Sequence, residues 1–302
     1  MFPDESTATR WFESVRWENV RYCGHCGSIA TQKTKTGKPM PYWCRDCKSY
    51  FSVRTNTPME SSRIPLHKWG IAIYLLCTNP KGISSLKMHR EIGISQKSAW
   101  HMVHRIREGL GIQEGDAHFR EPVEVDEAYM GGKEGNKHSS KKLRMGRGMV
   151  GKTAVVGIKT RHSGEVYART VKSTDRKTLH GIIRKHVRKG ARVYTDEARA
   201  YKKLHGYRHQ SVKHSVGQYV DGMAHTNGME SFWSMLKRGY HGTYHKMSPK
   251  HLDRYCNEFA GRHNIRQMDT LEQMEEVVRQ MNGRTLPYNR LIGTQKCKCL
   301  VK

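Results

Sequence analysis

The sequence has no apolar stretch long enough to cross a membrane. Its longest candidate, Ile71 to Cys77, is much shorter than the roughly 18 apolar residues that a transmembrane helix needs. The first residues, Met1 to Arg16, mix acidic side chains with Trp11 and Phe12 and lack the apolar core of a signal peptide. We therefore expect a cytoplasmic protein with no membrane partner.

The sequence also lacks the spread of cysteines that is typical of a disulfide framework. Four of its eight cysteines form two tight pairs, two stand alone and two lie near the end: Cys23 with Cys26, Cys44 with Cys47, Cys77, Cys256, and Cys297 with Cys299. This distribution suits a reducing compartment and a single metal site.

Acidic residues are scarce relative to basic ones. Asp and Glu number 27 against 54 Lys and Arg, which gives a formal net charge of +27. Because such an excess destabilises the compact state by self-repulsion, its simplest compensation is a polyanionic partner, most commonly nucleic acid. Charge alone does not separate DNA from RNA or from a membrane surface, and a generally basic proteome would give the same composition.

The two cysteine pairs have the spacing of a zinc ribbon. Cys23-Gly-His-Cys26 and Cys44-Arg-Asp-Cys47 are separated by 17 residues, within the range for a site of four thiolates. Each turn points two thiolates at one ion, and the intervening hairpin completes the tetrahedron. We expect one structural Zn²⁺ in a ribbon over residues 1–57. His25 is an extra candidate ligand, and a redox dithiol, the alternative, would need only one of the two pairs.

Residues 58–115 have the pattern of a helix-turn-helix. Two helical stretches, Ser84–Glu91 and Ser95–Leu110, flank a turn that contains Gly93. On the second helix the apolar residues predict an inward face, made of Ala99, Met102, Val103 and Ile106. The other face would meet the major groove of double-stranded DNA and its phosphates, through Gln96, Lys97, His101, His104, Arg105 and Arg107. An ordinary helical hairpin is the alternative.

From residue 120 to 268 the pattern changes to alternating strands and helices. Strands are expected at Val123–Tyr129, Thr153–Lys159, Glu165–Val171, Ala191–Thr195 and His209–Val220, with helices at Arg176–Val187 and from about His225. Three strands, a helix, a strand and a later helix is the element order of an RNase H-like mixed sheet. A helix and a basic tail are expected over residues 269–302. The fold class is thus a multidomain α/β protein.

Two aspartates end strands that would be neighbours in such a sheet. Asp126 and Asp196 would converge because the first and fourth strands lie side by side. Carboxylates placed together can hold the two divalent ions, about 4 Å apart, that phosphodiester chemistry uses. Each aspartate also has an ordinary explanation: Asp196 could cap a helix at Glu197–Leu204, and Asp126 could be a turn residue.

A third set of polar residues lies on the helix that follows. Its apolar stripe is made of Met229, Phe232, Trp233 and Leu236, which predicts packing on a core. Glu230 lies at the border of this stripe, where it could bind a metal ion, with Lys237 placed to contact a phosphate. Asn227, one turn earlier, could offer a neutral oxygen to the same ion. An exposed Glu beside a solvated Lys is the alternative.

Together these motifs resemble the DDE-type transposases of bacterial insertion sequences, in the group with an N-terminal zinc ribbon. The resemblance covers about residues 10 to 266. It rests on the two cysteine pairs followed by Tyr50-Phe51, on Val125-Asp126-Glu-Ala-Tyr-Met-Gly-Gly132, on Tyr194-Thr-Asp196, and on a block from His225-Thr-Asn227-Gly-Met-Glu230 to Asn264.

The resemblance implies an RNase H-like domain that cuts element ends and joins the 3′-hydroxyls to target DNA. It implies two Mg²⁺ ions (Mn²⁺ could replace them) held by Asp126, Asp196 and a third residue, which is Glu in some members and Asn in others. We favour Glu230 over Asn227 because a charged oxygen binds Mg²⁺ more strongly. Lys237 and Arg238 would contact DNA, and a nucleoid-associated homo-oligomer would form on it. A non-catalytic DNA-binding regulator and a nuclease that cuts without joining are the alternatives.

Overall fold

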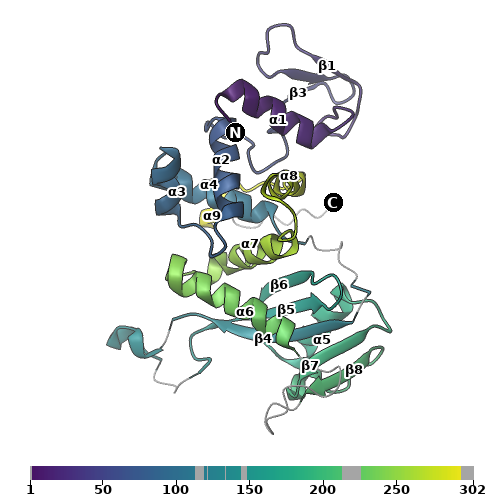
Figure 1. Cartoon of the computed structure of the whole chain (residues 1–302), viewed down its shortest axis with the longest axis vertical. Coiled ribbons are helices and arrows are strands. Elements are labelled where there is room, and N and C mark those ends of the chain that lie inside the picture. Colours follow the sequence, from purple (N-terminus) through teal and green to yellow (C-terminus); the bar gives the residue numbers. More distant parts are fainter. Residues whose placement is uncertain are drawn as a thin grey trace. The chain divides into compact units, whose positions relative to one another are not determined.

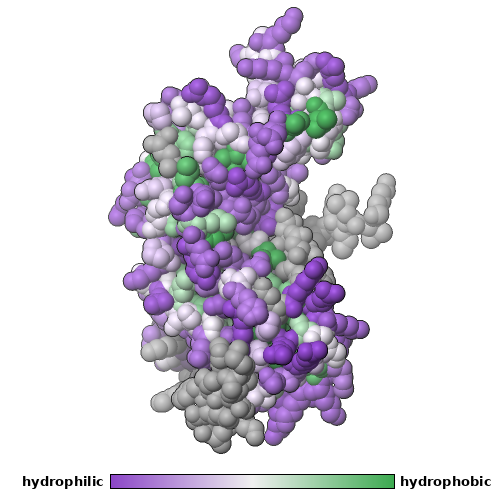
Figure 2. Space-filling view, turned by 45° about the vertical axis from the view of Figure 1, so that its right-hand side comes forward, coloured by the Kyte–Doolittle hydropathy of each residue, from purple (hydrophilic) through white to green (hydrophobic). Residues whose placement is uncertain are grey.

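The computed structural model describes residues 2–112, 119–120, 122–132, 134–143, 148–212 and 226–293. The chain divides into two compact units (Figure 1), one made of Met1–Leu110 with Ile265–Lys302 and the other of Gly111–Asn264. Hydrophilic side chains cover most of the face that Figure 2 presents, in keeping with the net charge of +27. Within the described ranges, no helix is long and apolar enough to cross a membrane.

The first unit begins with a helix and a small antiparallel sheet, α1 (Glu5–Trp17), β1 (Thr31–Lys33), β2 (Tyr42–Cys44) and β3 (Ser49–Phe51), in the strand order β1-β2-β3. Asp4 caps α1 by accepting from the Thr7 amide at 2.7 Å. Trp17 packs edge-on against Tyr42 and Phe51 at ring distances of 5.2 and 6.1 Å. These aromatic contacts attach a sheet too small for a core of its own to α1.

A group of helices completes the first unit, namely α2 (Leu66–Thr78), α3 (Ser85–Ile92), α4 (Gln96–Gly109), α8 (Thr270–Gln280) and α9 (Tyr288–Ile292). The predicted helix-turn-helix is present as α3 and α4. Gly93 ends α3 with φ 61°, a left-handed conformation that glycine adopts easily. Ser95 accepts from the Ser98 amide at 3.2 Å and so caps α4, as expected.

The C-terminal helix belongs to this same unit rather than forming a separate segment. The apolar side chains of α8, Met274, Val277 and Val278, are fully or almost fully buried and share a core with α2 and α4. The amphipathic pattern of residues 269–280 predicts such a helix but does not say what covers its apolar side. The expected basic tail falls largely in residues 294–302, outside the described part of the chain.

The second unit is a five-stranded mixed sheet with helices on both faces, and its strand order is β6-β5-β4-β7-β8. The strands are β4 (Val123–Met130), β5 (Thr153–Thr160), β6 (Val166–Val171), β7 (Arg192–Asp196) and β8 (Arg208–Val212), and the helices are α5 (Arg176–His186), α6 (Asn227–Gly239) and α7 (Leu252–Asn264). Short turns lie between them, η1 (Glu134–Asn136), η2 (Ser139–Lys141), η3 (Arg199–Tyr201), η5 (Tyr240–Tyr244) and η6 (Pro249–His251).

The topology of this sheet follows the expected order. β4, β5 and β6 are antiparallel neighbours, whereas β7 is parallel to β4, with Val123 opposite Val193 and Glu124 opposite Tyr194. Apolar residues of α5 pack on one face of the sheet and those of α6 and α7 on the other. The last strand ends at Val212, whereas the sequence predicts it to Val220; residues 213–225, with His225, lie outside the described chain.

Candidate functional site

The four paired cysteines meet at the expected metal site in the first unit. Their sulfur atoms all lie within 4.8 Å of one another. The Cys23 and Cys47 sulfurs are 3.6 Å apart, and those of Cys26 and Cys44 are 3.7 Å apart. Four thiolates about 2.3 Å from a zinc ion are about 3.8 Å from each other, so the cluster fits Zn²⁺. His25 Nε2 lies instead 3.2 Å from the Tyr50 carbonyl oxygen, away from the role of an extra ligand.

The predicted DNA-reading face of α4 is exposed only over its first turn. Gln96 and Lys97 are exposed, and the ammonium group of Lys97 lies 5.2 Å from the centre of the Tyr288 ring. His101 is half-buried, and its Nε2 atom lies 3.1 Å from the Leu286 carbonyl oxygen. Because recognition helices contact base edges mainly with their N-terminal residues, Gln96 and Lys97 remain placed for that role.

The outward position predicted for the later residues of α4 is wrong. Arg105 is 8% exposed and donates a hydrogen bond to the Glu60 carbonyl oxygen, and His104 and Arg107 are also buried. The physical reason is that the chain before α2 and the C-terminal segment cover this side of α4. Contacts with residues so distant in sequence cannot be seen in the periodicity of α4 alone.

In the second unit, three carboxylates meet at the edge between β4 and β7. One oxygen each from Asp126, Glu127 and Asp196 lies within 4.8 Å of the others. The convergence of Asp126 and Asp196 follows from the parallel pairing of β4 with β7, as expected. Asp196 ends its strand as predicted, whereas Asp126 lies in the middle of β4 rather than at its end. Asp196 also accepts from the Ala198 amide at 3.1 Å, so it supports the local turn as well. The predicted helix over residues 197–204 is only the short turn η3.

The electrostatics of this cluster favour a bound cation. Burial, reinforced by repulsion from Asp196 and Glu230, raises the pKa of Asp126 to about 6. Burial, together with repulsion from Asp196 and Asp126, raises the pKa of Glu127 to about 7. Partly buried carboxylates that repel one another release this free energy when a divalent cation neutralises them. The oxygen-only donor set fits Mg²⁺ or Mn²⁺.

Glu127 is the member of the cluster that the sequence analysis misses. Neighbouring residues of a strand point to opposite faces of a sheet, and Asp126 faces α6, where the Trp233 Nε1 atom donates to its Oδ2 at 3.0 Å. Glu127 therefore starts from the α5 face. It reaches the cluster because β7 pairs with β4 only at Val123 and Glu124, which leaves the edge of β4 open beyond them.

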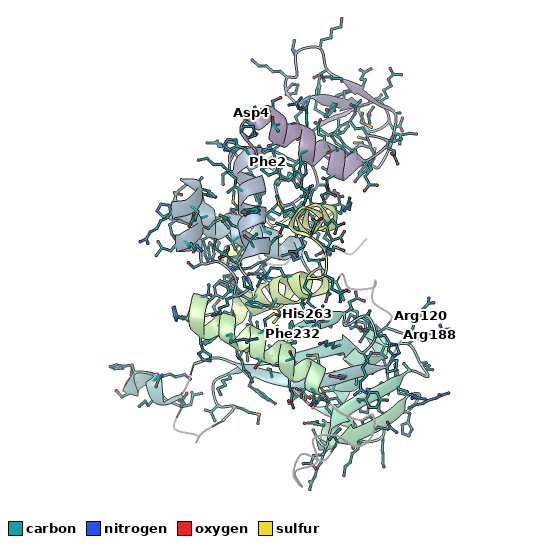
Figure 3. The ribbon with its side chains drawn as sticks, in the orientation of Figure 1. Phe2, Asp4, Arg120, Arg188, Phe232 and His263 are labelled. Atoms are coloured by element: carbon teal, nitrogen blue, oxygen red, sulfur yellow. The ribbon has the colours of Figure 1, made fainter. Side chains whose placement is uncertain are left out.

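Helix α6 carries the remaining predicted residues. The residues of its apolar stripe, Met229, Phe232, Trp233 and Leu236, are all buried, as predicted. Figure 3 shows Phe232 of α6 and His263 of α7 lying toward each other, with ring centres 5.8 Å apart. Glu230 is exposed and lies outside the three-carboxylate group, but its charge contributes to the raised pKa of Asp126. Asn227, Lys237 and Arg238 are exposed.

Contacts at its first turn fix α6 to the sheet. The buried carboxylate of Glu124 accepts from the Met229 amide at 3.0 Å. Lys159 of β5 donates to the Gly228 carbonyl oxygen at 3.1 Å. A methyl group on Gly157 of β5 would lie 2.1 Å from Met229 Cε and 2.7 Å from the Trp233 ring, so the helix approaches the sheet closely only because residue 157 is glycine.

A hollow of about 380 Å³ adjoins the carboxylates. Its lining includes Glu127, Lys152, Lys237, Tyr240 and His241. Lys237 and Glu127 thus both line one cavity, together with Lys152, next to the carboxylate cluster. This is the composition expected where a phosphodiester approaches metal ions.

The chain is similar to known proteins over most of its length. Residues 118–264, which contain the three carboxylates and α6, match the ISXO2-like transposase domain. The chain is 28% identical over 276 residues to an uncharacterized protein in transposable element ISH50 of Halobacterium salinarum, covering 87% of this chain and 92% of that protein. Among solved structures, a simian T-cell lymphotropic virus intasome in complex with PP2A regulatory subunit B56 gamma is 12% identical at a TM-score of 0.29, covering 61% of this chain and 66% of that one.

Proposed function

This chain belongs to the DDE-type transposases of insertion sequences, and from that premise we propose that it cleaves the DNA ends of its element and joins them to target DNA. The observation that carries the proposal is the convergence of Asp126 and Asp196 at the β4–β7 edge, beside a hollow lined by Lys237. The match to the transposase domain supports this type of reaction, and the carboxylate cluster is where we propose that it takes place.

In this proposal Asp126 and Asp196 would together hold the divalent ions. Two Mg²⁺ ions, or Mn²⁺, would neutralise the phosphate and stabilise the attacking and leaving oxygens. Water attacks the phosphorus at an element end, the P–O bond to the 3′ oxygen breaks, and a 3′-hydroxyl is released. That hydroxyl then attacks a target phosphodiester, and the 3′ oxygen on the target strand leaves. Lys237 contacts the phosphate that reacts.

The third ligand comes from the first turn of α6. Asn227 and Glu230 are both exposed there and are held near Asp126 by the contacts of Glu124 and Trp233. We assign the role to Glu230, because its charge already acts on Asp126 and a charged oxygen binds Mg²⁺ more strongly than an amide.

The DNA-binding role is divided between the two units. Gln96 and Lys97, exposed at the start of α4, are placed to enter the major groove, and Lys237 with Arg238 contacts phosphates near the cleavage site. His101 and Arg105, held by carbonyl oxygens of their own unit, act by positioning α4. Joining two ends in one reaction requires that both be held together, so we propose a homo-oligomer on the DNA.

Incubation of the zinc-loaded protein with Mg²⁺ and labelled DNA from both flanks of its gene tests this function. The proposal expects strand cleavage at the element ends followed by joined product. Binding without cleavage would identify a DNA-binding regulator, and cleavage without joined product would identify a nuclease. Either of these outcomes contradicts the proposal.

A further inference from the structure

Glu127 has a carboxylate oxygen close enough to those of Asp126 and Asp196 to share a metal ion with them. Its position in β4 would not predict this. Its backbone places the side chain on the face of the sheet opposite Asp126. A carboxylate oxygen of Glu127 nevertheless lies within 4.8 Å of oxygens of both Asp126 and Asp196. Ligands about 2.1 Å from Mg²⁺ are at most about 4.2 Å apart, so a small movement of side chains brings all three to one ion.

Tyr201 supplies an independent observation on the same side of the sheet. Its ring is completely buried, and its hydroxyl lies next to the Glu127 carboxylate but makes no well-formed hydrogen bond with any described residue. The charged groups that act on it are Glu127, Asp196 and Asp126, in that order. A buried hydroxyl without a partner is costly, and a carboxylate fixed by a metal ion would provide the missing acceptor.

The hollow beside the cluster gives the site a position relative to substrate. Glu127 is one of its lining residues, and Lys237 of α6, the helix toward which Asp126 is turned, is another. An ion held by this cluster would therefore lie close to the space in which a phosphodiester would meet Lys152 and Lys237.

We propose that Glu127 is a further ligand of the metal site: it reaches around the open edge of β4 and would, with Asp196 and Asp126, hold a divalent ion. Tyr201 is its positioning residue, since its hydroxyl donates to the Glu127 oxygen that does not contact the ion. This inference rests on the proposed metal-dependent cleavage and adds a fourth carboxylate to its site.

The test is the affinity of the full-length, zinc-loaded protein for Mn²⁺, with free Mn²⁺ measured by electron paramagnetic resonance. Glu127→Gln should weaken Mn²⁺ binding at least about tenfold, because a charged ligand is lost, and Tyr201→Phe should weaken it by about tenfold, the lower end of the effect of groups that orient metal ligands. Glu91→Gln and Tyr74→Phe, which change exposed residues of the other unit, should leave the affinity unchanged.

Thermal melting without metal separates a ligand from a structural residue. Glu127→Gln removes charge repulsion, so the metal-free variant should melt at no lower a temperature than the wild type. If Glu127 were instead a structural residue, its loss would lower the melting temperature.

If Glu127→Gln fails to fold, the Mn²⁺ affinities of Glu127→Asp and Tyr201→Phe test the inference in its place, and unchanged affinity in both overturns it. Loss of affinity in Asp126→Asn but not in Glu127→Gln overturns the role of Glu127 alone. Unchanged affinity in Asp126→Asn and Asp196→Asn as well contradicts the metal site of the proposed function.

Discussion

Asp126 lies between an aromatic donor and two other acids. The Trp233 Nε1 atom donates to one of its oxygens at 3.0 Å, and one oxygen each of Asp196 and Glu127 lies within 4.8 Å of an Asp126 oxygen. The indole therefore fixes the orientation of the carboxylate before any ion binds. Such preorganisation keeps a metal site within the narrow geometry that phosphodiester chemistry requires.

The raised pKa values predict that the metal-free protein loses stability as pH rises. Asp126 and Glu127 have folded-state pKa values of about 6 and about 7, above the ordinary values of 3.8 and 4.5. Below about pH 4 both groups are protonated in the folded and unfolded chains. As pH rises to about 7, these two carboxyl groups ionise first in the unfolded chain. This lowers the free energy of unfolding by on the order of a few kcal/mol.

Melting of the metal-free protein between pH 5 and 8 measures this effect, with the Asp126→Asn, Glu127→Gln double variant as reference. The stability of the wild type relative to the variant should fall with rising pH, and Mg²⁺ should restore it most at pH 8. If the wild type gained stability relative to the variant between pH 5 and 8, this would contradict the raised pKa values of Asp126 and Glu127.

We predict that the sulfur atoms of the four paired cysteines bind one zinc ion. Cys44→Ser should remove most of the zinc and strongly destabilise the ribbon, because its sheet has little core without the ion. Elemental analysis of the purified protein measures zinc per chain, and Cys77→Ser, a change to a cysteine in α2, is the matched control. Zinc retained at one ion per chain in Cys44→Ser would refute the site.

At the scale of elements, α6 is the helix that the catalytic proposal depends on. The apolar stripe of α6 is a local pattern, as are the caps of α3 and α4, and all of these could be predicted from the sequence. The contacts that Glu124 and Lys159 make with the first turn of α6 could not be predicted, because they join residues about 70 to 100 positions apart. For the same reason the sequence missed Glu127, whose position depends on where the pairing of β4 with β7 stops.

The close approach of α6 to the sheet can be tested at Gly157. Gly157→Ala should destabilise the protein by about 1–3 kcal/mol and lower cleavage further, because the new methyl group pushes Met229 and Trp233 away from β5. Gly181→Ala, in an exposed turn of α5 with nothing within 4 Å, should instead stabilise by up to about 1 kcal/mol. Denaturant unfolding measures both, and equal stability of the two variants would argue against close packing at Gly157.

On the scale of the whole molecule, the sequence predicted the element order and the mixed sheet better than the assembly of the first unit. The strands of the second unit follow alternation and turns, which are local. The burial of Arg105 and the docking of α8 depend on which distant segment covers α4, and hydrophobic periodicity carries no such information. The part of the candidate site that was predictable is the part fixed by topology, namely Asp126 beside Asp196.

The net charge of +27 is also a property of the whole chain. If its lysines and arginines contact phosphates, the logarithm of the DNA association constant should fall linearly with the logarithm of the salt concentration. The slope should be about −0.9 for each phosphate neutralised. Fluorescence anisotropy with a long duplex at several salt concentrations measures this slope. A slope near zero would mean that the excess charge serves another purpose.

The central claim is that Asp126 and Asp196 hold the metal ions that cut DNA. A gel assay of end cleavage and end binding in Mg²⁺ should show that Asp126→Asn and Asp196→Asn abolish cleavage while binding survives or tightens slightly, since each change removes a negative charge near phosphate. Glu230→Gln should also abolish cleavage, and Asn227→Ala should lower cleavage less. If Asn227→Ala lowers cleavage more than Glu230→Gln, the third ligand is Asn227. Normal cleavage by Asp126→Asn or Asp196→Asn would contradict the account.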